Sequence, residues 1–170
     1  MTLNCIIIDN DPLQRLGTLN IIKENPSIKI IGEFSSAIES KRFLQNNHVN
    51  LIVMEVNFPV LNGFDLIDFC NNTKEISTPR IVITSHDESQ AFKAFEYYVT
   101  DFISKPVNKD RFDKAISRVI SEVKMNNNFE DHNSEHIFVK SNLKKRKIYI
   151  NEIKWIEALG DYVKLITNDK

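Results

Sequence analysis

Five short apolar runs, each followed by a segment with helical periodicity, constrain the fold of this chain more than any other feature. None of the runs alternates regularly between apolar and polar residues, as a strand with one solvated face would. The runs cover residues 3–8, 28–34, 51–56, 80–84 and 101–104. The helical segments cover residues 12–24, 37–45, 64–71 and 89–97, and a fifth follows Asn108. This order predicts an α/β fold with a five-stranded, doubly wound parallel sheet.

The sequence changes character after residue 124. Residues 125–136 are polar and lack periodicity, so we expect a non-helical linker there. Short apolar stretches follow at residues 137–139, 147–150, 153–157 and 162–167, without any further helical pattern. The 170 residues are therefore expected to form one full domain at residues 1–124 and a smaller, C-terminal β-rich fragment at residues 137–170.

Charge and composition exclude several classes of protein. The net charge is −1, so the chain as a whole has no electrostatic attraction to nucleic acid or to a membrane. No apolar run is long enough to span a bilayer, and acidic residues follow the first strand too early for a signal peptide. The two cysteines, Cys5 and Cys70, lie in apolar runs and are expected to be buried, reduced thiols. We therefore expect a cytoplasmic protein.

Polar side chains follow the predicted strands at their carboxyl ends, where sheets of this class bind ligands. An acid cluster, a hydroxyl and a lysine in one cleft suit phosphoryl chemistry. Carboxylates hold Mg²⁺, while the lysine and the hydroxyl orient phosphoryl oxygens. The residues concerned are Asp9, Asn10, Asp11, Glu55, Ser85 and Lys105. The polarity that is common at strand ends explains any one of them, but it does not explain the whole set.

Four sequence blocks make this indication specific, namely IIIDNDP, LIVMEVNFPVLNG, IVITS and FISKP. In this order they resemble the signature blocks of response regulator receiver domains. The intervals of 30 residues from Glu55 to Ser85 and 50 residues from Glu55 to Lys105 also agree with that family. The resemblance covers the chain from residue 3 to about residue 124. It implies a flavodoxin-like fold without enzymatic activity and a sensor histidine kinase as partner. It also implies homodimers formed through the fourth helix, the fifth strand and the fifth helix.

The resemblance also assigns roles to individual positions. Glu55 stands at the phospho-acceptor position, and Ser85 and Lys105 stand at the positions that sense the phosphoryl group. Phe102 stands at the position of the aromatic switch residue. The positions that hold Mg²⁺ in the family are occupied by Asp9, Asn10, Glu55 and, through its backbone carbonyl, Asn57.

Two of these positions depart from the family pattern, which has aspartate at position 55 and a second acid at position 10. Glu55 is longer than aspartate by about one C–C bond, so its carboxylate reaches further into the space that a phosphoryl group would fill. Its single charge imitates only part of the roughly −1.5 to −2 charge of a phosphoryl group. Asn10 keeps an oxygen ligand but removes a charge, so Mg²⁺ binding is expected to be weakened unless Asp11 compensates.

Three interpretations of Glu55 follow from these departures. The receiver is independent of phosphorylation and biased toward its active form, or the pocket is degenerate and only shapes an interaction surface. Both of these are favoured over a third, in which Glu55 or another acid still forms an acyl phosphate. The residues alone do not separate the first two.

The β-rich fragment carries a second resemblance. The block IKWIEALGDYVKL is similar to the opening of a LytTR-type DNA-binding domain, a family in which a receiver and an all-β domain share one chain. The matching segment is much shorter than such a domain and can hardly bury a core of its own. A basic run at residues 144–147 could contact phosphates, although a solvated hairpin turn explains it as well. We expect DNA binding and transcription regulation only from a complete C-terminal domain.

Two other classes of function compete with the receiver. In a haloacid-dehalogenase-like phosphatase, Asp9 would be the nucleophile and Asp11 the general acid and base. Against this interpretation, Pro12 stands where that family has threonine or valine, and the block around Glu55 is unexplained. A metal-free adaptor module, which binds a partner without phosphate, is the other alternative.

Overall fold

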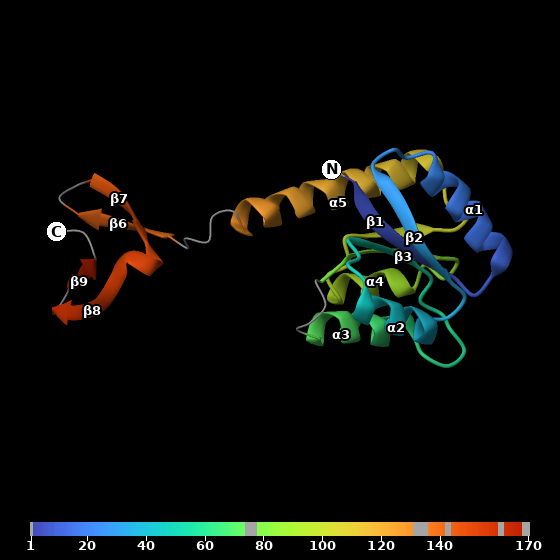
Figure 1. Ribbon diagram of the computed structural model, residues 1–170, viewed down its shortest axis with the longest axis horizontal. Helices are drawn as coiled ribbons and strands as arrows, with labels where there is room; N and C mark the ends of the chain where they lie inside the picture. Colours follow the sequence, from blue (N-terminus) through green and yellow to red (C-terminus); the bar gives the residue numbers. More distant parts are fainter. Residues whose placement is uncertain (1, 74–77, 131–135, 142–143, 160–161, 168–170) are drawn as a thin grey trace. The chain divides into compact units, whose positions relative to one another are not determined.

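The structure is a computed structural model that describes residues 2–73, 78–130, 136–141, 144–159 and 162–167 (Figure 1). The chain divides into two compact units, Met1–Val123 and Lys124–Lys170. In the first unit, strands and helices alternate strictly along the chain. They are β1 (Leu3–Ile8), α1 (Pro12–Lys23), β2 (Ile28–Phe34), α2 (Ala37–Asn46), β3 (Leu51–Met54), α3 (Gly63–Asn72), β4 (Arg80–Ser85), α4 (Gln90–Glu96), β5 (Asp101–Ser104) and α5 (Lys109–Glu130).

The five strands form one parallel sheet in the order β2-β1-β3-β4-β5. This confirms the predicted doubly wound α/β fold. The chain moves outward from β1 to β2 and then returns to the other side of β1 with β3. The carboxyl ends of β1 and β3 therefore flank the point where the strand order reverses, which is where open sheets of this kind bind ligands.

Helices cover both faces of the sheet, and this is why the central strands are largely apolar (Figure 1). Successive residues of β1 point to opposite faces, so Ile6 and Ile8 pack in one cluster while Cys5 and Ile7 pack in the other. The first cluster includes Leu44 of α2 and residues of α3 and α4. The second includes residues of α1 and α5. Neither face of the central strands needs polar residues.

Local signals account for several helix ends. Ser36 caps α2 by accepting a hydrogen bond from the Glu39 amide at 3.3 Å, and Asn108 accepts one from the Arg111 amide at 3.2 Å. Strand β3 ends at Met54, two residues before the predicted end, so Glu55 follows the strand instead of lying inside it.

Helix α5 continues to Glu130, whereas the sequence pattern predicted that the helix would end near residue 124 and that a non-helical linker would follow. That prediction is wrong for residues 125–130. The helix contains no glycine or proline from Lys109 onward, and extending a formed helix adds one hydrogen bond for each residue. Polar composition alone is therefore no stop signal. Residues 131–135 of the expected linker lie outside the described residues.

The second unit contains two antiparallel hairpins, which pair β6 (His136–Ser141) with β7 (Lys144–Tyr149) and β8 (Ile153–Leu159) with β9 (Tyr162–Thr167). A short 3-10 helix, η1 (Ile150–Glu152), precedes β8. The basic run at residues 144–147 belongs to strand β7 and is not a hairpin turn. Trp155, Ile156 and Val163 are more than half exposed, and none of the residues of this unit whose burial is described belongs to a buried core. Within the described residues, no helix is long and apolar enough to cross a membrane.

Candidate functional site

Four side chains from four loops meet at the carboxyl edge of the sheet. Asp9 follows β1, Glu55 follows β3, Ser85 ends β4 and Lys105 follows β5. Their relative exposures are 2%, 6%, 0% and 9%, so the cluster is buried. We call these four residues the acidic pocket. Parallel strands end at the same edge of a sheet, and the two acids belong to the strands at the reversal point.

Lys105 joins the two acids of this pocket. Its Nζ atom donates to Asp9 Oδ2 and to Glu55 Oε2, and both distances are 2.8 Å. Side-chain exposures of 2% for Lys105 and Asp9 and 8% for Glu55 leave little water to screen the charges. Hydrogen bonds between charged groups in such surroundings are short and strong. The three groups together carry one excess negative charge.

The other carboxylate oxygen of Glu55 is also fully engaged. Its Oε1 atom accepts hydrogen bonds from the Val56 amide, the Asn57 amide and the Ser85 hydroxyl at 2.8, 3.2 and 2.8 Å. Burial disfavours the charged form of Glu55. The hydrogen bond from Lys105, together with those from the backbone and from Ser85, outweighs burial and holds the pKa of Glu55 below its ordinary value. Glu55 is therefore ionised at neutral pH.

The loop after β1 uses its acids differently from the expectation. Asp9 Oδ1 accepts from the Asp11 amide at 2.9 Å. Asp11 caps α1, because its Oδ1 atom accepts from the amides of Leu13 and Gln14 at 2.8 and 3.2 Å. These backbone hydrogen bonds lower the pKa of Asp11. One oxygen of its carboxylate thus caps the helix, and whether Asp11 compensates for the charge that Asn10 lacks stays a prediction.

Receiver domains typically bind Mg²⁺, and the donor set of this pocket does not fit such an ion. Mg²⁺ requires several oxygen ligands in near-octahedral geometry. Here both oxygens of Asp9 and both oxygens of Glu55 accept hydrogen bonds from the protein. Asn10 and Asn57 are exposed, and no group of three acidic, histidine or cysteine side chains among the described residues is arranged to hold a metal ion. The Lys105 ammonium instead bridges the two acids and neutralises one of their two charges.

Gly63 lies against the backbone that carries Glu55. A Cβ atom at this position would lie 2.7 Å from the Val56 Cα atom and 3.1 Å from the Glu55 carbonyl oxygen. The Gly63 amide donates to the Val56 carbonyl at 2.9 Å. The backbone that presents Glu55 can approach the start of α3 this closely only because position 63 has no side chain.

A second ionic cluster joins β5 to α5 and was not anticipated from the sequence. Asp101, whose side chain is 6% exposed, accepts two hydrogen bonds from Arg111 at 2.6 and 2.8 Å and one from Arg118 at 2.9 Å. Arg111 also donates to the carbonyl of Phe102 at 2.7 Å. Phe102 is half-buried against the core cluster that includes α3 and α4. Its role as a switch residue stays a prediction.

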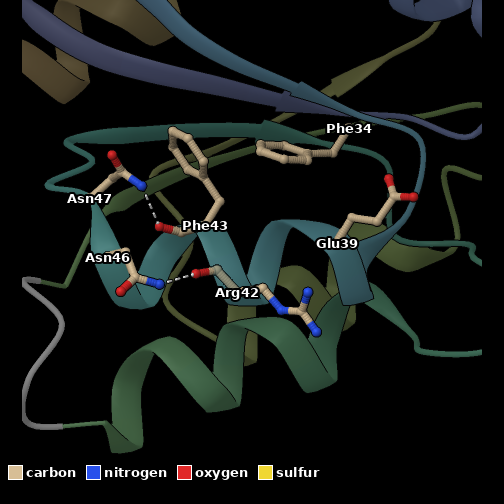
Figure 2. A pocket seen from close by; sticks show the side chains of 6 residues that line it. All are labelled: Phe34, Glu39, Arg42, Phe43, Asn46 and Asn47. Carbon is tan, nitrogen blue, oxygen red and sulfur yellow. Dashed lines mark hydrogen bonds between the residues drawn. The ribbon is translucent and has the colours of Figure 1, made fainter.

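An open hollow of about 330 Å³ lies elsewhere in the first unit, beside β2 and α2 (Figure 2). The residues that line it are Phe34, Glu39, Arg42, Phe43, Asn46 and Asn47. None of them belongs to the acidic pocket, and most are exposed. The hollow is therefore separate from the candidate site.

Comparison with known families identifies residues 5–117 as matching the response regulator receiver domain. The match lies within the first unit and includes all four residues of the acidic pocket. The family is not an enzyme family, so the phosphatase alternative based on Asp9 and Asp11 is set aside.

Individual relatives agree with this match. An uncharacterized response regulatory protein of Shewanella oneidensis is 25% identical over 156 residues, covering 91% of this chain and 65% of that protein. The sensory transduction protein LytR of Staphylococcus epidermidis is 32% identical, covering 69% of this chain and 46% of its own length. Transcriptional regulatory protein BtsR of Escherichia coli is 26% identical over 69% of this chain and 48% of its own length. The chain thus spans roughly half to two thirds of these relatives.

Solved structures share the fold. The response regulatory domain of mrkE from Klebsiella pneumoniae superposes with a TM-score of 0.65 at 24% identity, covering 72% of this chain and 99% of that one. The receiver domain of AraT from Geobacillus stearothermophilus gives a TM-score of 0.65 at 17% identity, covering 75% and 99%.

Proposed function

The chain belongs to the response regulator receiver family, and from this premise we propose that it is a receiver whose output does not depend on phosphorylation. The observation that carries the proposal is the pair of hydrogen bonds that Glu55 makes with Ser85 and Lys105. These are the two residues that the family resemblance assigns to sensing a phosphoryl group. In this chain they already hold a negatively charged group.

The length of glutamate accounts for these contacts. An aspartate at position 55 would place its carboxylate about one C–C bond further back. Glu55 carries one charge, compared with roughly −1.5 to −2 for a phosphoryl group, so it satisfies the sensing residues only in part. The single charge is matched by the single ammonium of Lys105. The charge of Glu55 is thus matched locally without a metal ion or a phosphoryl group, and the negative charge of Asp9 remains in excess.

The test is exposure of the native chain to a small-molecule phosphodonor with Mg²⁺, followed by intact mass measurement. We expect no gain in mass. An Asn10→Asp/Glu55→Asp double variant restores both residues of the typical pattern and serves as the positive control. Stoichiometric modification of the native chain would contradict the proposal.

A metal-free adaptor is the second candidate, and the closed donor set of the pocket favours it. Every carboxylate oxygen of Asp9 and Glu55 accepts at least one hydrogen bond from the protein, so an incoming group would have to share or displace these donors. The two candidates differ in the effect of removing the charge of Glu55. A Glu55→Gln variant would change partner binding in a receiver biased toward its active form. The same variant would leave partner binding unchanged in an adaptor that uses only surface shape.

The partner and the output of the whole protein are proposed from its membership of the receiver family. We propose that a sensor histidine kinase is the upstream partner and that the output is transcription regulation. The similarity to the Shewanella oneidensis protein extends over 156 residues, more than the 123 residues of the first unit. It therefore includes part of the second unit, in keeping with a LytTR-type DNA-binding domain that begins there. DNA binding is proposed only for a chain with the complete domain, and a salt-dependent DNA shift with these 170 residues alone would contradict this.

Dimers are proposed to form through the face of α4, β5 and α5. Helix α4 carries Phe92 and Phe95, which are 77% and 81% exposed, and Tyr98 beyond its end is 93% exposed. Such a group of apolar side chains on a surface marks interaction sites more often than a single exposed residue does. Light scattering of a Tyr98→Asp variant tests this, with a monomer expected where the native chain forms dimers. A variant that dimerises as the native chain does would contradict it.

A further inference from the structure

We propose that the hollow beside β2 and α2 is a docking site for a peptide segment of a partner protein in which an aromatic residue stands next to an acidic one. The hollow measures about 330 Å³ and is open to solvent (Figure 2). Sites for small molecules enclose most of the ligand surface, which an open hollow of this size does not do. It suits one large side chain that stays attached to a chain outside. Docking there involves none of the residues of the acidic pocket.

The apolar wall of the hollow is made by two phenylalanine rings. The rings of Phe34 and Phe43 lie side by side, with their centroids 5.2 Å apart and their planes tilted by 56° (Figure 2). Both residues pack against the buried core and remain partly exposed. Aromatic rings prefer edge-to-face and offset contacts, and two tilted rings offer both an edge and a face to a third ring. An aromatic side chain is therefore the apolar group that this wall suits best.

A close approach that only glycine permits sets the position of the Phe34 ring. A Cβ atom at Gly32 of edge strand β2 would lie 2.7 Å from Phe34 Cε2 and 3.0 Å from Phe34 Cζ. The ring thus occupies the space that a side chain at position 32 would take. Adding a methyl group at Gly32 displaces the ring, so it alters the apolar wall without changing any residue that lines the hollow.

The charged residues of the hollow favour an acid beside the aromatic ring. Arg42 is exposed, and its side chain makes no hydrogen bond or ion pair within the part of the chain that the structure describes. A guanidinium group binds a carboxylate through short, paired hydrogen bonds. Glu39 lies below Phe34, at one end of the hollow (Figure 2). Its charge repels an acid at that end, so Arg42 and Glu39 together fix the direction in which an acidic peptide lies.

Two asparagines shape the other end of the hollow. The Nδ2 atom of Asn46 donates to the Arg42 carbonyl, and that of Asn47 donates to the Phe43 carbonyl, both at 2.9 Å. These bonds satisfy carbonyl groups near the end of α2 and hold both side chains against the helix. The walls are thus already formed in the free chain, which lowers the entropic cost of binding.

The place of the hollow in the sheet keeps it apart from the proposed dimer face. Strands β2 and β5 are the two edges of the sheet. A peptide bound beside β2 therefore leaves the face of α4, β5 and α5 uncovered. Docking at one edge is compatible with dimerisation at the other.

The test is a titration of the 170-residue chain with acetyl-Trp-Glu-amide, followed by backbone amide chemical shifts. We expect the signals of Phe34, Phe43 and Asn47 to shift. Acetyl-Trp-Gln-amide lacks the charge and should bind about two- to fivefold more weakly, the range for an exposed ion pair. Acetyl-Ala-Glu-amide lacks the ring and should shift none of these signals.

Variants of the chain assign these effects to the two walls. Arg42→Gln should weaken the binding of acetyl-Trp-Glu-amide by the same two- to fivefold and leave that of acetyl-Trp-Gln-amide unchanged. Gly32→Ala should weaken both tryptophan peptides alike, because it displaces the ring of Phe34 and leaves Arg42 in place. Lys29→Gln is the matched control, because Lys29 is an exposed cation of β2 that does not line the hollow, and it should change neither affinity.

Three results would overturn the proposal. The first is the absence of shifts at the hollow with acetyl-Trp-Glu-amide, and the second is equal affinity for the two tryptophan peptides. The third is binding of free tryptophan as tightly as acetyl-Trp-Glu-amide, which would assign the hollow to a small molecule. Arg42 is exposed, so Arg42→Gln decides the matter if Gly32→Ala does not fold.

Discussion

The ammonium of Lys105 lies 2.8 Å from the carboxylate of Glu55, across 50 residues of sequence, and both side chains are almost completely buried. Asp9 shares the same ammonium. The ionic cluster therefore ties the loops after β1, β3 and β5 together at the centre of the candidate site. Its behaviour when a charge is removed, a proton is added or a metal ion is offered follows from this arrangement.

Removing the cation should be costly. Lys105→Met leaves Asp9 and Glu55 as two buried carboxylates without a counter-charge, and breaking a buried ion pair in this way costs about 3–5 kcal/mol. Urea unfolding followed by circular dichroism measures the loss in unfolding free energy. Lys109→Met is the matched control, because Lys109 pairs with Asp113 at the surface, where water and salt screen the ion pair. Similar losses for both variants would contradict the prediction.

Stability should depend on the protonation of Glu55. The pKa of Glu55 in the folded chain lies below its ordinary value of about 4.3. The ionised group therefore stabilises the fold above that value, and its contribution is lost as the pH falls through the lower, folded-state pKa. We expect the difference in unfolding free energy between the native chain and Glu55→Gln to be largest above the ordinary pKa of glutamate and to shrink as the pH falls below it. Urea unfolding at a series of pH values measures this. The exposed Glu39→Gln variant should show no such trend, and a difference that grows with acid would refute the assignment.

Magnesium should have little effect on the native chain. Because Lys105 and backbone amides already occupy the carboxylate oxygens, we expect no change in thermal unfolding beyond that of NaCl at matched ionic strength. The Asn10→Asp/Glu55→Asp variant regains a typical set of acids and should be stabilised, by about 1.4 kcal/mol when Mg²⁺ is at ten times its dissociation constant. A comparable stabilisation of the native chain would show that the ammonium yields to the ion.

Two glycines should respond in opposite directions to the same substitution. Gly63→Ala places a Cβ atom against the Val56 backbone, and overpacking of this kind costs about 1–3 kcal/mol. Gly17 lies within α1, and a methyl group added there would meet no heavy atom within 4 Å outside its own helix. Gly17→Ala should therefore stabilise the chain by about 0.5–1 kcal/mol through higher helix propensity. Chemical denaturation of both variants measures the difference, and equal effects would argue against a steric role for Gly63.

Much of the fold could be predicted because its determinants are local or periodic. Continuous apolar runs separated by amphipathic segments indicated a parallel sheet between two layers of helices, and the caps at Ser36 and Asn108 followed from single residues. The end of α5 was predicted too early, because a polar composition was taken as a stop signal where no glycine or proline interrupts the helix. The structural roles of Gly63 and Asp101 were not predicted. Gly63 contacts backbone atoms, and Asp101 pairs with arginine side chains of α5, so neither contact leaves a local pattern in the sequence.

The sequence by itself determined the order of strands and helices, the edge of the sheet at which Asp9, Glu55, Ser85 and Lys105 gather, and the presence of an acid that is longer than the family pattern expects. Only the tertiary structure decided which oxygen of Glu55 meets which donor and that Asp11 caps a helix. The physical reason is the difference in the sequence distance over which the two kinds of interaction act. Hydrophobic periodicity acts over a few residues and survives in the sequence, whereas a hydrogen bond depends on tenths of an ångström between atoms that the sheet brings together from 30 to 96 residues apart.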